Sequence, residues 1–333
     1  MDFSDYESII DNNYNINPNN NEVCLFSIKD EDHKMLTLLK IALEKKEFSE
    51  RVFNLTKCII DFNSQHYTAW HVRKKCIETM VKELSKEPVD ISSLLKNEMS
   101  YVHAITYDNP KCYQLWWYRR YILKLIGNDN EDLVYVSCSI QQDAKNMSAW
   151  AHRVWLIKQF FKDNLDIYTT EINFTSSLIR DDCRNNSVWC YRHFIFRLLL
   201  SDETRKLDFE EIISEELEFI IYWLERVPHN EALWNYIRVI FNNPQVGQEF
   251  ESKTEYMNLK TIPSFFEEAV NHIYEKYKVT CHQASYFITC LSYARGNICK
   301  VQDCLKALEI SDPIRRYFWN WKLCNIVDRK INL

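Results

Sequence analysis

The residue types that most often bind metals or act as nucleophiles are plentiful in this sequence, but their spacing fits neither role. There are 12 Cys and 9 His. The closest cysteine pairs, Cys183/Cys190 and Cys299/Cys304, are seven and five residues apart, so no C-x-x-C motif is present. No histidine belongs to an H-E-x-x-H run or lies at zinc-finger spacing from a cysteine. The sequence therefore predicts that the chain binds no metal by itself and that its cysteines are reduced, buried small side chains.

Composition excludes several further classes of site. The 3 Gly form no glycine-rich phosphate loop, and the net charge of −6 disfavours binding to a nucleic-acid backbone. The longest stretch without Asp, Glu, Lys or Arg, residues 279–294, is too short to span a bilayer. The N-terminus, MDFSDYESII, lacks the basic region of a signal peptide. We therefore expect a cytoplasmic protein that neither inserts into a membrane nor binds nucleic acid.

Hydrophobic residues recur with a helical period through most of the chain. One such apolar stripe is formed by Met35, Leu38, Leu39, Ala42 and Leu43. Short breaks that carry Pro, Asn or Asp separate the periodic segments, and no long alternation of apolar and polar residues predicts a strand. The sequence therefore predicts an all-α chain. Residues 1–30, which include the run DNNYNINPNNNE, are expected to form a flexible leader.

The chain contains internal repeats. Five segments align without gaps around a tryptophan, namely Trp70, Trp116, Trp150, Trp189 and Trp234. An arginine follows three residues later in the first four copies and four residues later in the fifth, and a weaker sixth copy surrounds Trp319. Successive tryptophans of the five copies are 34 to 46 residues apart, which is the length of one helical hairpin per repeat. We therefore predict a single repeat domain over residues 31–333, an α-solenoid of stacked helical hairpins.

The repeated residues have a structural explanation. A two-helix hairpin cannot bury its apolar face alone, so a tryptophan near the start of one helix is expected to fill the seam with the next hairpin. Asn146, Asn185 and Asn230 each precede their tryptophan by four residues, where an asparagine can cap the helix. The arginine lies one turn further on the same side. In most copies we expect tryptophan and arginine to serve the fold alone.

Taken together, these segments resemble the repeats of the α subunit shared by protein farnesyltransferase and type I protein geranylgeranyltransferase. The resemblance runs from about Glu50 to the C-terminus, and its most specific motifs are DAKNMSAWAHRVW and DDCRNNSVW in successive repeats. It implies a right-handed, crescent-shaped solenoid that embraces a β subunit, an α/α barrel. In this family the barrel holds the catalytic Zn²⁺ and most of the pocket for the prenyl diphosphate and the CaaX peptide. The resemblance also implies Mg²⁺ dependence and transfer of farnesyl or geranylgeranyl from its diphosphate to a cysteine thiol.

The resemblance also assigns roles to individual residues. Lys145, in DAKN, stands at the position of the lysine that contacts the diphosphate, where an ammonium would stabilise the charge on the leaving group. Arg153, Asn185 and Trp189 match positions next to the active site and are expected to support Lys145 and the subunit contact rather than to do chemistry. Tyr113 matches a tyrosine that lines the pocket for the last CaaX residue.

Two residues depart from the family pattern. Met147 stands where the family has an active-site tyrosine, so one hydroxyl near the diphosphate is missing. Ser148 stands where the family tends to place a longer polar side chain that reaches the carboxylate of the peptide. Peptide selectivity is therefore expected to differ, or a water molecule to bridge the gap.

Other interpretations remain open at this point. One is a helical-repeat scaffold with no catalytic role, and another is a repeat protein that reads RNA one base at a time. The acidic balance weighs against RNA, and a scaffold has no need for the ammonium of Lys145. The α subunit of the type II, Rab-directed enzyme has D-E-R-N at this motif and additional domains, so DAKN and the length of 333 residues point away from it.

Overall fold

The fold is known from a computed structural model that describes residues 2–6, 9, 30–84, 88–127, 131–162, 164–201, 209–241, 259 and 262–331. Within these residues the chain forms helices and turns and no strand, so the all-α prediction is confirmed. The helices are α2 (Asp30–Glu44), α3 (Glu50–Phe62), α4 (Tyr67–Glu83), α5 (Pro88–Asp108), α6 (Tyr113–Ile126), α7 (Glu131–Gln142), α8 (Met147–Phe160), α9 (Leu165–Asp181), α10 (Asn186–Ser201), α11 (Phe209–Arg226), α12 (Glu231–Ile240), α13 (Ser264–Tyr277), α14 (His282–Ala294), α15 (Ile298–Ser311), the 3₁₀ turn η3 (Pro313–Arg315) and α16 (Arg316–Ile331).

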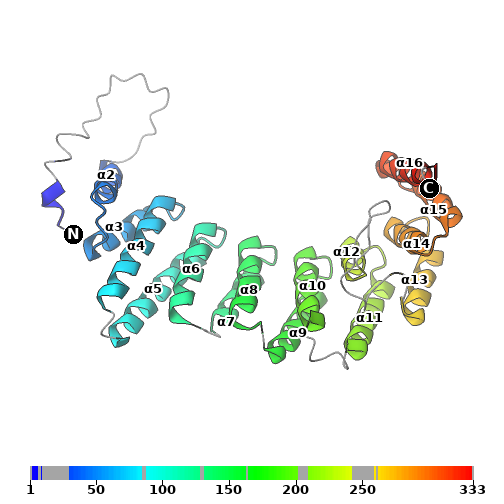
Figure 1. The fold of residues 1–333 in the computed structure, drawn as a ribbon, viewed down its shortest axis with the longest axis horizontal. Helices are drawn as coiled ribbons and strands as arrows, with labels where there is room; N and C mark the ends of the chain where they lie inside the picture. Colours follow the sequence, from blue (N-terminus) through cyan, green and yellow to red (C-terminus); the bar gives the residue numbers. More distant parts are fainter. Residues whose placement is uncertain are drawn as a thin grey trace, which may run out of the picture. The chain divides into compact units, whose positions relative to one another are not determined.

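Contacts group the helices into two compact units, Met1–Phe160 and Phe161–Leu333. In the first unit, α3 pairs with α4, α5 with α6 and α7 with α8, and the tryptophan-bearing helices α4, α6 and α8 lie side by side (Figure 1). In the second unit, α9 pairs with α10, and α10 packs beside α12, which packs beside α14. This stacking of antiparallel hairpins is the predicted α-solenoid. That residues 31–333 form a single domain remains a prediction.

The residues expected as a leader are described only in part. Residues 1, 7–8 and 10–29 lie outside the described residues. Residues 4–6 are helical, and Phe3 and Tyr6 are buried in the apolar core of the first unit, where Leu39 and Val52 also lie.

The five aligned tryptophans occupy equivalent places. Each is at most 7% exposed, and each indole Nε1–H donates to the carbonyl oxygen six residues earlier, at 2.7–3.0 Å. Each indole therefore fills the space beside its hairpin turn and satisfies one turn carbonyl at the same time. The sixth copy is different, because Trp319 donates to the carboxylate of Asp312 instead, at 3.1 Å.

The predicted asparagine caps are confirmed, and they also join neighbouring repeats. The side-chain oxygens of Asn146, Asn185 and Asn230 accept hydrogen bonds from the first-turn amides of α8, α10 and α12. The amide of Asn146 donates to Pro110 O at 2.9 Å, and that of Asn230 to Cys183 O at 2.7 Å. The caps of α8 and α12 thereby fix the start of their helices against the turn of the preceding repeat.

Cysteine makes the same connection at two other turns. The Sγ of Cys112 donates to Ser64 O at 3.3 Å, and that of Cys281 to Pro228 O at 3.1 Å. All cysteines among the described residues are free, as predicted. The expectation that they are buried is wrong for Cys138, Cys190, Cys299 and Cys324, which are exposed, and Cys58 and Cys183 are only partly buried.

Buried charges clamp successive hairpins together. Arg73 forms a bidentate pair with Glu98 at 2.6 and 2.7 Å, and Tyr118 of the next repeat donates to the same carboxylate at 2.8 Å. Arg192 and Glu216 repeat this arrangement at 2.7 and 2.6 Å, with Tyr236 as the third member. Such pairs specify which helices lie together, and removing one partner typically costs about 3–5 kcal/mol because the other charge stays buried.

At Arg119, the corresponding arginine of the second aligned copy, one of these hydrogen bonds is missing. The Nη1 of Arg73 donates to Phe53 O and Thr56 Oγ1, and the equivalent atoms of Arg153 and Arg192 also find a carbonyl and a hydroxyl on the preceding helix. The Nη1 of Arg119 is buried and has no hydrogen-bond partner within the described residues. The sequence explains this difference, because Val102 and His103 stand 17 and 16 residues before Arg119, where Arg73 and Arg192 have Thr56 and Thr175 and Arg153 has Ser137.

The substitution Val102→Thr is therefore expected to stabilise the protein. It keeps the shape of the side chain and supplies a hydroxyl to the orphaned Nη1–H, which should raise the free energy of unfolding by about 1–2 kcal/mol. Denaturant unfolding measures the change. The control is Val270→Thr in α13, which is also 0% exposed and buries a hydroxyl away from Arg119; it should destabilise. Equal losses from both substitutions would contradict the assignment.

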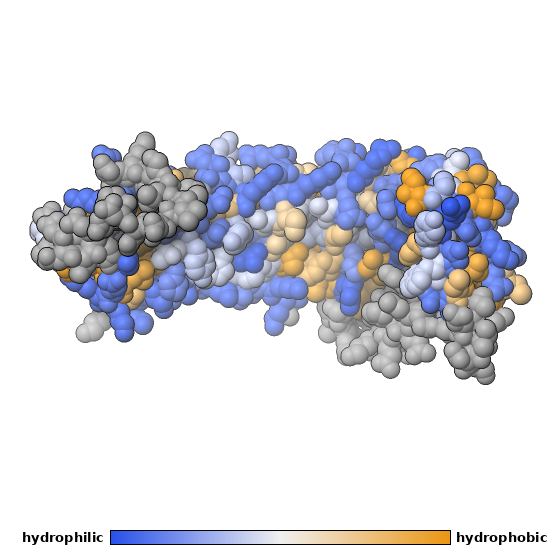
Figure 2. Space-filling view, turned by 90° about the horizontal axis from the view of Figure 1, so that it is seen from above, coloured by the Kyte–Doolittle hydropathy of each residue, from blue (hydrophilic) through white to orange (hydrophobic). Residues whose placement is uncertain are grey.

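The end of the second unit leaves large apolar side chains uncovered. Ile310, Ile314, Tyr317 and Trp321 are 83%, 92%, 80% and 56% exposed. The space-filling view shows apolar residues gathered over this end among hydrophilic ones (Figure 2). An exposed apolar cluster of this kind is typical of a contact surface.

Candidate functional site

The turn Asp143–Asn146, which contains the DAKN motif, is held rigidly at the start of α8. The Oδ1 of Asp143 accepts a hydrogen bond from the backbone N–H of Lys145 at 3.0 Å, and the N–H of Asn146 donates back to Asp143 O at 3.0 Å. Trp150 Nε1 donates to Ala144 O at 3.0 Å. Asp143, Ala144 and Asn146 thus stabilise the turn through their hydrogen bonds. The hydrogen bond from the Lys145 N–H also fixes the orientation of the backbone at Lys145.

The side chain of Lys145 is exposed. Within the described residues, no hydrogen bond or ion pair to its Nζ is present. Lys145 precedes the first residue of α8, Met147, by two positions, so its ammonium adds to the positive end of the helix dipole. A cation in front of a helix N-terminus is a favourable place for an anionic group such as a phosphate.

The neighbouring turn, before α6, brings a second lysine close to the first. Lys111 Nζ lies 3.2 Å from Asp143 Oδ2, while Asp143 Oδ1 holds the backbone of Lys145. The hydrogen bond from Lys145 N–H, together with Lys111, lowers the pKa of Asp143 below its usual value. Asp143 therefore stays ionised and ties the two lysine-bearing turns together.

Tyr113 and Met147 occupy equivalent positions as the first residues of α6 and α8. Tyr113 is 70% exposed and Met147 is 83% exposed, and Tyr67, the first residue of α4, is 68% exposed. Ser148 is half-buried, and its N–H donates to the Asn146 cap. The structure therefore brings four of the predicted residues, Tyr113, Lys145, Met147 and Ser148, to the N-terminal ends of two adjacent helices.

Arg153, Asn185 and Trp189 are buried and occupied by structural contacts. Arg153 is 3% exposed and donates to Leu133 O and to Ser137 Oγ. Asn185 caps α10, and Trp189 is 1% exposed with its indole bonded to Cys183 O at 2.8 Å. Asn185 and Trp189 belong to the second unit, whereas Lys145 and Arg153 belong to the first.

His152, further along α8, forms a cluster with Asp132 and with Arg119 and Arg120 of α6, and all of these side chains are buried except the half-buried Arg120. His152 Nε2 lies 2.6 Å from Asp132 Oδ2, and Arg120 Nε donates to His152 Nδ1 at 3.3 Å. Because Nδ1 accepts from Arg120, Nε2 carries the proton and the imidazole is neutral. Burial lowers the pKa of His152 below its usual value, against the opposing effect of Asp132. This cluster replaces the glutamate and tyrosine of the other clamps with a shorter acid and a histidine, so we assign it to the fold.

The described part of the chain shows neither a metal-binding cluster nor a membrane-spanning helix. It holds no group of three or more His, Cys, Asp or Glu side chains that could bind a metal ion. None of its helices has the length and apolar character needed to cross a bilayer.

The sequence did not lead us to predict that Asp143 and Lys111 help to hold the Lys145 turn. The signal for Lys111 was present, because it precedes Trp116 by five residues just as Lys145 precedes Trp150. The acidic members of the clamps were missed as well, since Glu98 and Glu216 follow their arginines by 25 and 24 residues and belong to no local motif.

Comparison with known proteins matches five segments to the family described as protein prenyltransferase alpha subunit repeat, residues 49–80, 95–126, 129–160, 168–199 and 213–244. The chain is 28% identical over 338 residues to the protein farnesyltransferase/geranylgeranyltransferase type-1 subunit alpha of Candida albicans, covering 98% of this chain and 97% of that one. The geranylgeranyl transferase type-2 subunit alpha of Bos taurus is 26% identical, but the match covers 58% of this chain and 34% of the relative.

A solved structure agrees with the sequence. The fold is similar to a chain in the structure of Candida albicans protein geranylgeranyltransferase-I complexed with GGPP, with a TM-score of 0.71 and 25% identity over 93% of this chain and 95% of that chain. The repeats, the nearly full-length match to a type-1 subunit and the shared fold agree with one another. The chain therefore belongs to the protein prenyltransferase α-subunit repeat family, and its similarity along its whole length is to the type-1 subunit rather than the type-2 subunit.

Proposed function

We propose that this chain is the α subunit of a heterodimeric CaaX protein prenyltransferase, which transfers farnesyl or geranylgeranyl from its diphosphate to a cysteine thiol. The observation that carries the proposal is the match to a type-1 α subunit over 98% of the chain, together with a fold match to a type I enzyme complexed with GGPP. The catalytic residue contributed by this chain is Lys145. Its partner is a barrel-shaped β subunit, and the heterodimer works in the cytoplasm.

The geometry of the Lys145 turn supports this role. As the bond between the prenyl carbon and the diphosphate oxygen breaks, negative charge grows on the diphosphate. An ammonium on a turn fixed by Asp143 and Asn146, in front of a helix N-terminus, is already in place before the reaction and needs no rearrangement. The same edge also carries three exposed apolar side chains, those of Tyr67, Tyr113 and Met147 at the first positions of α4, α6 and α8. Such a surface suits contact with a partner subunit or with the end of a CaaX peptide.

The metals of the reaction are assigned to other components of the complex. By its resemblance to the family, the complex would hold Zn²⁺ in the β subunit and would depend on Mg²⁺. Zn²⁺ bound there would lower the pKa of the CaaX cysteine thiol and so favour the thiolate that acts as the nucleophile. The residues of this chain act on the leaving diphosphate and at the interface.

Co-expression with a barrel subunit of the same organism tests the proposal. We expect a stable 1:1 complex that transfers a prenyl group from farnesyl or geranylgeranyl diphosphate to a CaaX peptide, whereas the chain alone is inactive. An interface of an obligate complex usually buries about 2,000–5,000 Å², so the soluble yield should rise sharply with the partner. A monomer with the same yield and melting temperature in the presence and absence of every candidate barrel would favour the scaffold interpretation.

A further inference from the structure

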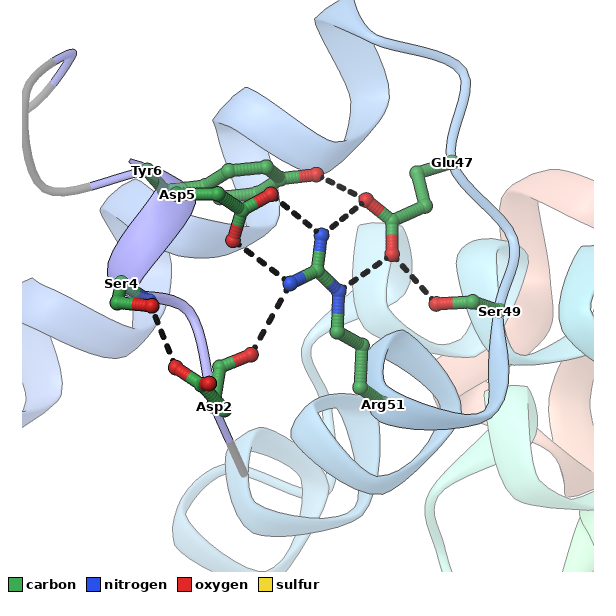
Figure 3. A network of polar contacts seen from close by, with 7 residues as sticks. All are labelled: Asp2, Ser4, Asp5, Tyr6, Glu47, Ser49 and Arg51. Atoms are coloured by element: carbon green, nitrogen blue, oxygen red, sulfur yellow. Dashed lines mark hydrogen bonds and ion pairs between the residues drawn. The ribbon is translucent and has the colours of Figure 1, made fainter.

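Residues 2–6 make a dense set of contacts with the turn that joins α2 to α3 and with the start of α3. Arg51, at the start of α3, donates two hydrogen bonds to the carboxylate of Asp5, at 2.7 and 2.9 Å, and one to Asp2 O at 3.0 Å. The same guanidinium donates twice to Glu47, at 2.7 and 2.8 Å. Figure 3 shows Arg51 at the centre of this network, between the N-terminal segment and the turn that joins α2 to α3.

Two aromatic side chains anchor the same segment. Phe3 and Tyr6 are 8% and 0% exposed and belong to the apolar core of the first unit. The guanidinium of Arg51 lies 4.9 Å from the ring centroid of Phe3, and Lys45 Nζ lies 4.1 Å from that of Tyr6. The hydroxyl of Tyr6 donates to Glu47. Residues 2–6 are therefore held by apolar burial, cation–π contacts and ionic hydrogen bonds together.

The receiving surface has a fixed shape of its own. The chain leaves α2 through Lys46, which has a φ of 54°, in the left-handed region that non-glycine residues rarely adopt. This conformation lets Glu47 N–H bond to Ala42 O at 2.9 Å and turns the Glu47 side chain towards Arg51. Ser49 also donates to the Glu47 carboxylate, at 2.5 Å. The hydrogen bonds from Arg51 lower the pKa of Glu47 to about 2, so this acceptor is ionised at neutral pH.

The position of this surface in the repeat array gives it a role. The first matched repeat begins at residue 49, so α2 lies before the matched repeats along the chain. In a repeat protein each hairpin covers its neighbour, and a terminal hairpin needs a cap to cover its apolar face. Residues 2–6 meet this need, because Phe3 and Tyr6 lie in one apolar cluster with Leu38, Leu39 and Ala42 of α2.

We propose that α2, residues 45–49 and the start of α3 form a peptide-binding socket for an acidic and aromatic segment, and that residues 2–6 occupy it as a clasp on the first hairpin. The socket selects its ligand by chemistry. Arg51 requires a carboxylate at the fifth position and an accessible carbonyl at the second, Glu47 requires a hydroxyl at the sixth, and the apolar core requires a large ring at the third. The sequence Asp2-Phe3-Ser4-Asp5-Tyr6 meets all four requirements. This function is independent of prenyl transfer.

The test removes the clasp and returns it as a separate peptide. In the heterodimer, deletion of residues 2–6 should increase amide exchange in α2 and at the start of α3 about tenfold or more, and leave exchange in the second unit unchanged. The synthetic peptide MDFSDYESI should bind the truncated protein, restore protection and raise its melting temperature, but should not bind the intact chain, whose socket is filled. The same peptide with Asp5→Lys or Tyr6→Phe should bind at least about tenfold more weakly, because each change removes a buried or ionic hydrogen bond.

Point substitutions keep the test decisive if the truncated chain fails to fold. Asp5→Ala and Arg51→Ala should each lower the melting temperature, and the double variant should lose much less than the sum of the two. Arg295→Ala is the matched control, because Arg295 forms a similar bidentate pair with Glu267, at 2.6 and 2.7 Å, in the second unit; it should have little effect. Additive losses, unchanged exchange after truncation, or binding of the peptide to the intact chain would each overturn the clasp. If residues 2–6 of one intact chain fill the socket of a second copy instead, the proposal that they act within their own chain would be wrong.

Discussion

The heterodimer that carries Lys145→Ala is expected to transfer its prenyl group about 10²–10³-fold more slowly than the unmodified enzyme. This is the usual cost of removing one preplaced group that stabilises charge in the transition state. The charge on the diphosphate grows as its bond to the prenyl carbon breaks. A cation placed for that charge therefore affects the transition state more than the bound substrate. The value of kcat should fall strongly, whereas the affinity for the prenyl diphosphate should change less. Single-turnover transfer to a CaaX peptide measures the chemical step directly.

The chain supplies a matched control for this experiment. Lys111 lies at the same place in the preceding repeat, is 79% exposed and pairs with Asp143. Lys111→Ala removes the same charge from the adjacent turn, and the rate should stay within a few-fold of the unmodified rate because surface pairs of this kind contribute little. Lys145→Arg should recover only part of the activity, since the guanidinium is broader and directs its hydrogen bonds differently. A Lys145→Ala rate within about twofold of the unmodified rate would remove Lys145 from the site.

The second large effect is on stability. Trp189→Ala should lower the free energy of unfolding by about 3–5 kcal/mol, the usual cost of truncating a buried large aromatic residue. Trp189 is 1% exposed, packs against Phe219 and Tyr236 with ring centroids 6.0 and 5.0 Å away, and satisfies Cys183 O with its indole N–H. Denaturant unfolding and the melting temperature of the heterodimer measure the loss. Any fall in turnover should follow the fall in folded protein.

Two further substitutions separate packing from other effects. Trp189→Phe keeps a ring in the seam but loses the hydrogen bond to Cys183 O, so its cost should lie between those of the unmodified protein and Trp189→Ala. Trp321→Ala is the exposed control, since Trp321 is 56% exposed in α16, and it should change the stability of the isolated chain by no more than about 0.5 kcal/mol. Full stability with lost turnover in Trp189→Ala would place this residue in the site instead of the core.

Local sequence was sufficient to predict the hairpins and their caps. Asn146 and Asn230 bond to amides two or three residues away, and each aligned tryptophan bonds to a carbonyl six residues earlier, so a short segment contains both partners. The apolar stripe from Met35 to Leu43 predicted a helix for the same reason, and these residues lie in α2. The motif around Lys145 likewise contains the residues that fix its own turn.

The pairings between hairpins required the tertiary structure. Arg73 and Arg119 have the same local motif, but the first has a hydroxyl for its Nη1 and the second does not, because the partner position lies on another helix. The N-terminal segment gives a stronger example. Asp5 and Arg51 are 46 residues apart, and an acidic segment followed by an asparagine-rich run resembles a leader until the fold brings it to α3.

The sequence by itself therefore determined the type of element, the number of tryptophan-centred repeats and the location of the exposed lysine, because these depend on side chains within one hairpin. Only the tertiary structure decided which acid meets each buried arginine, which arginine lacks a partner and what covers the first hairpin. The physical reason is that these contacts join residues 13 to 46 positions apart, whose energies depend on burial and on which helices become neighbours after folding. A local pattern specifies neither quantity.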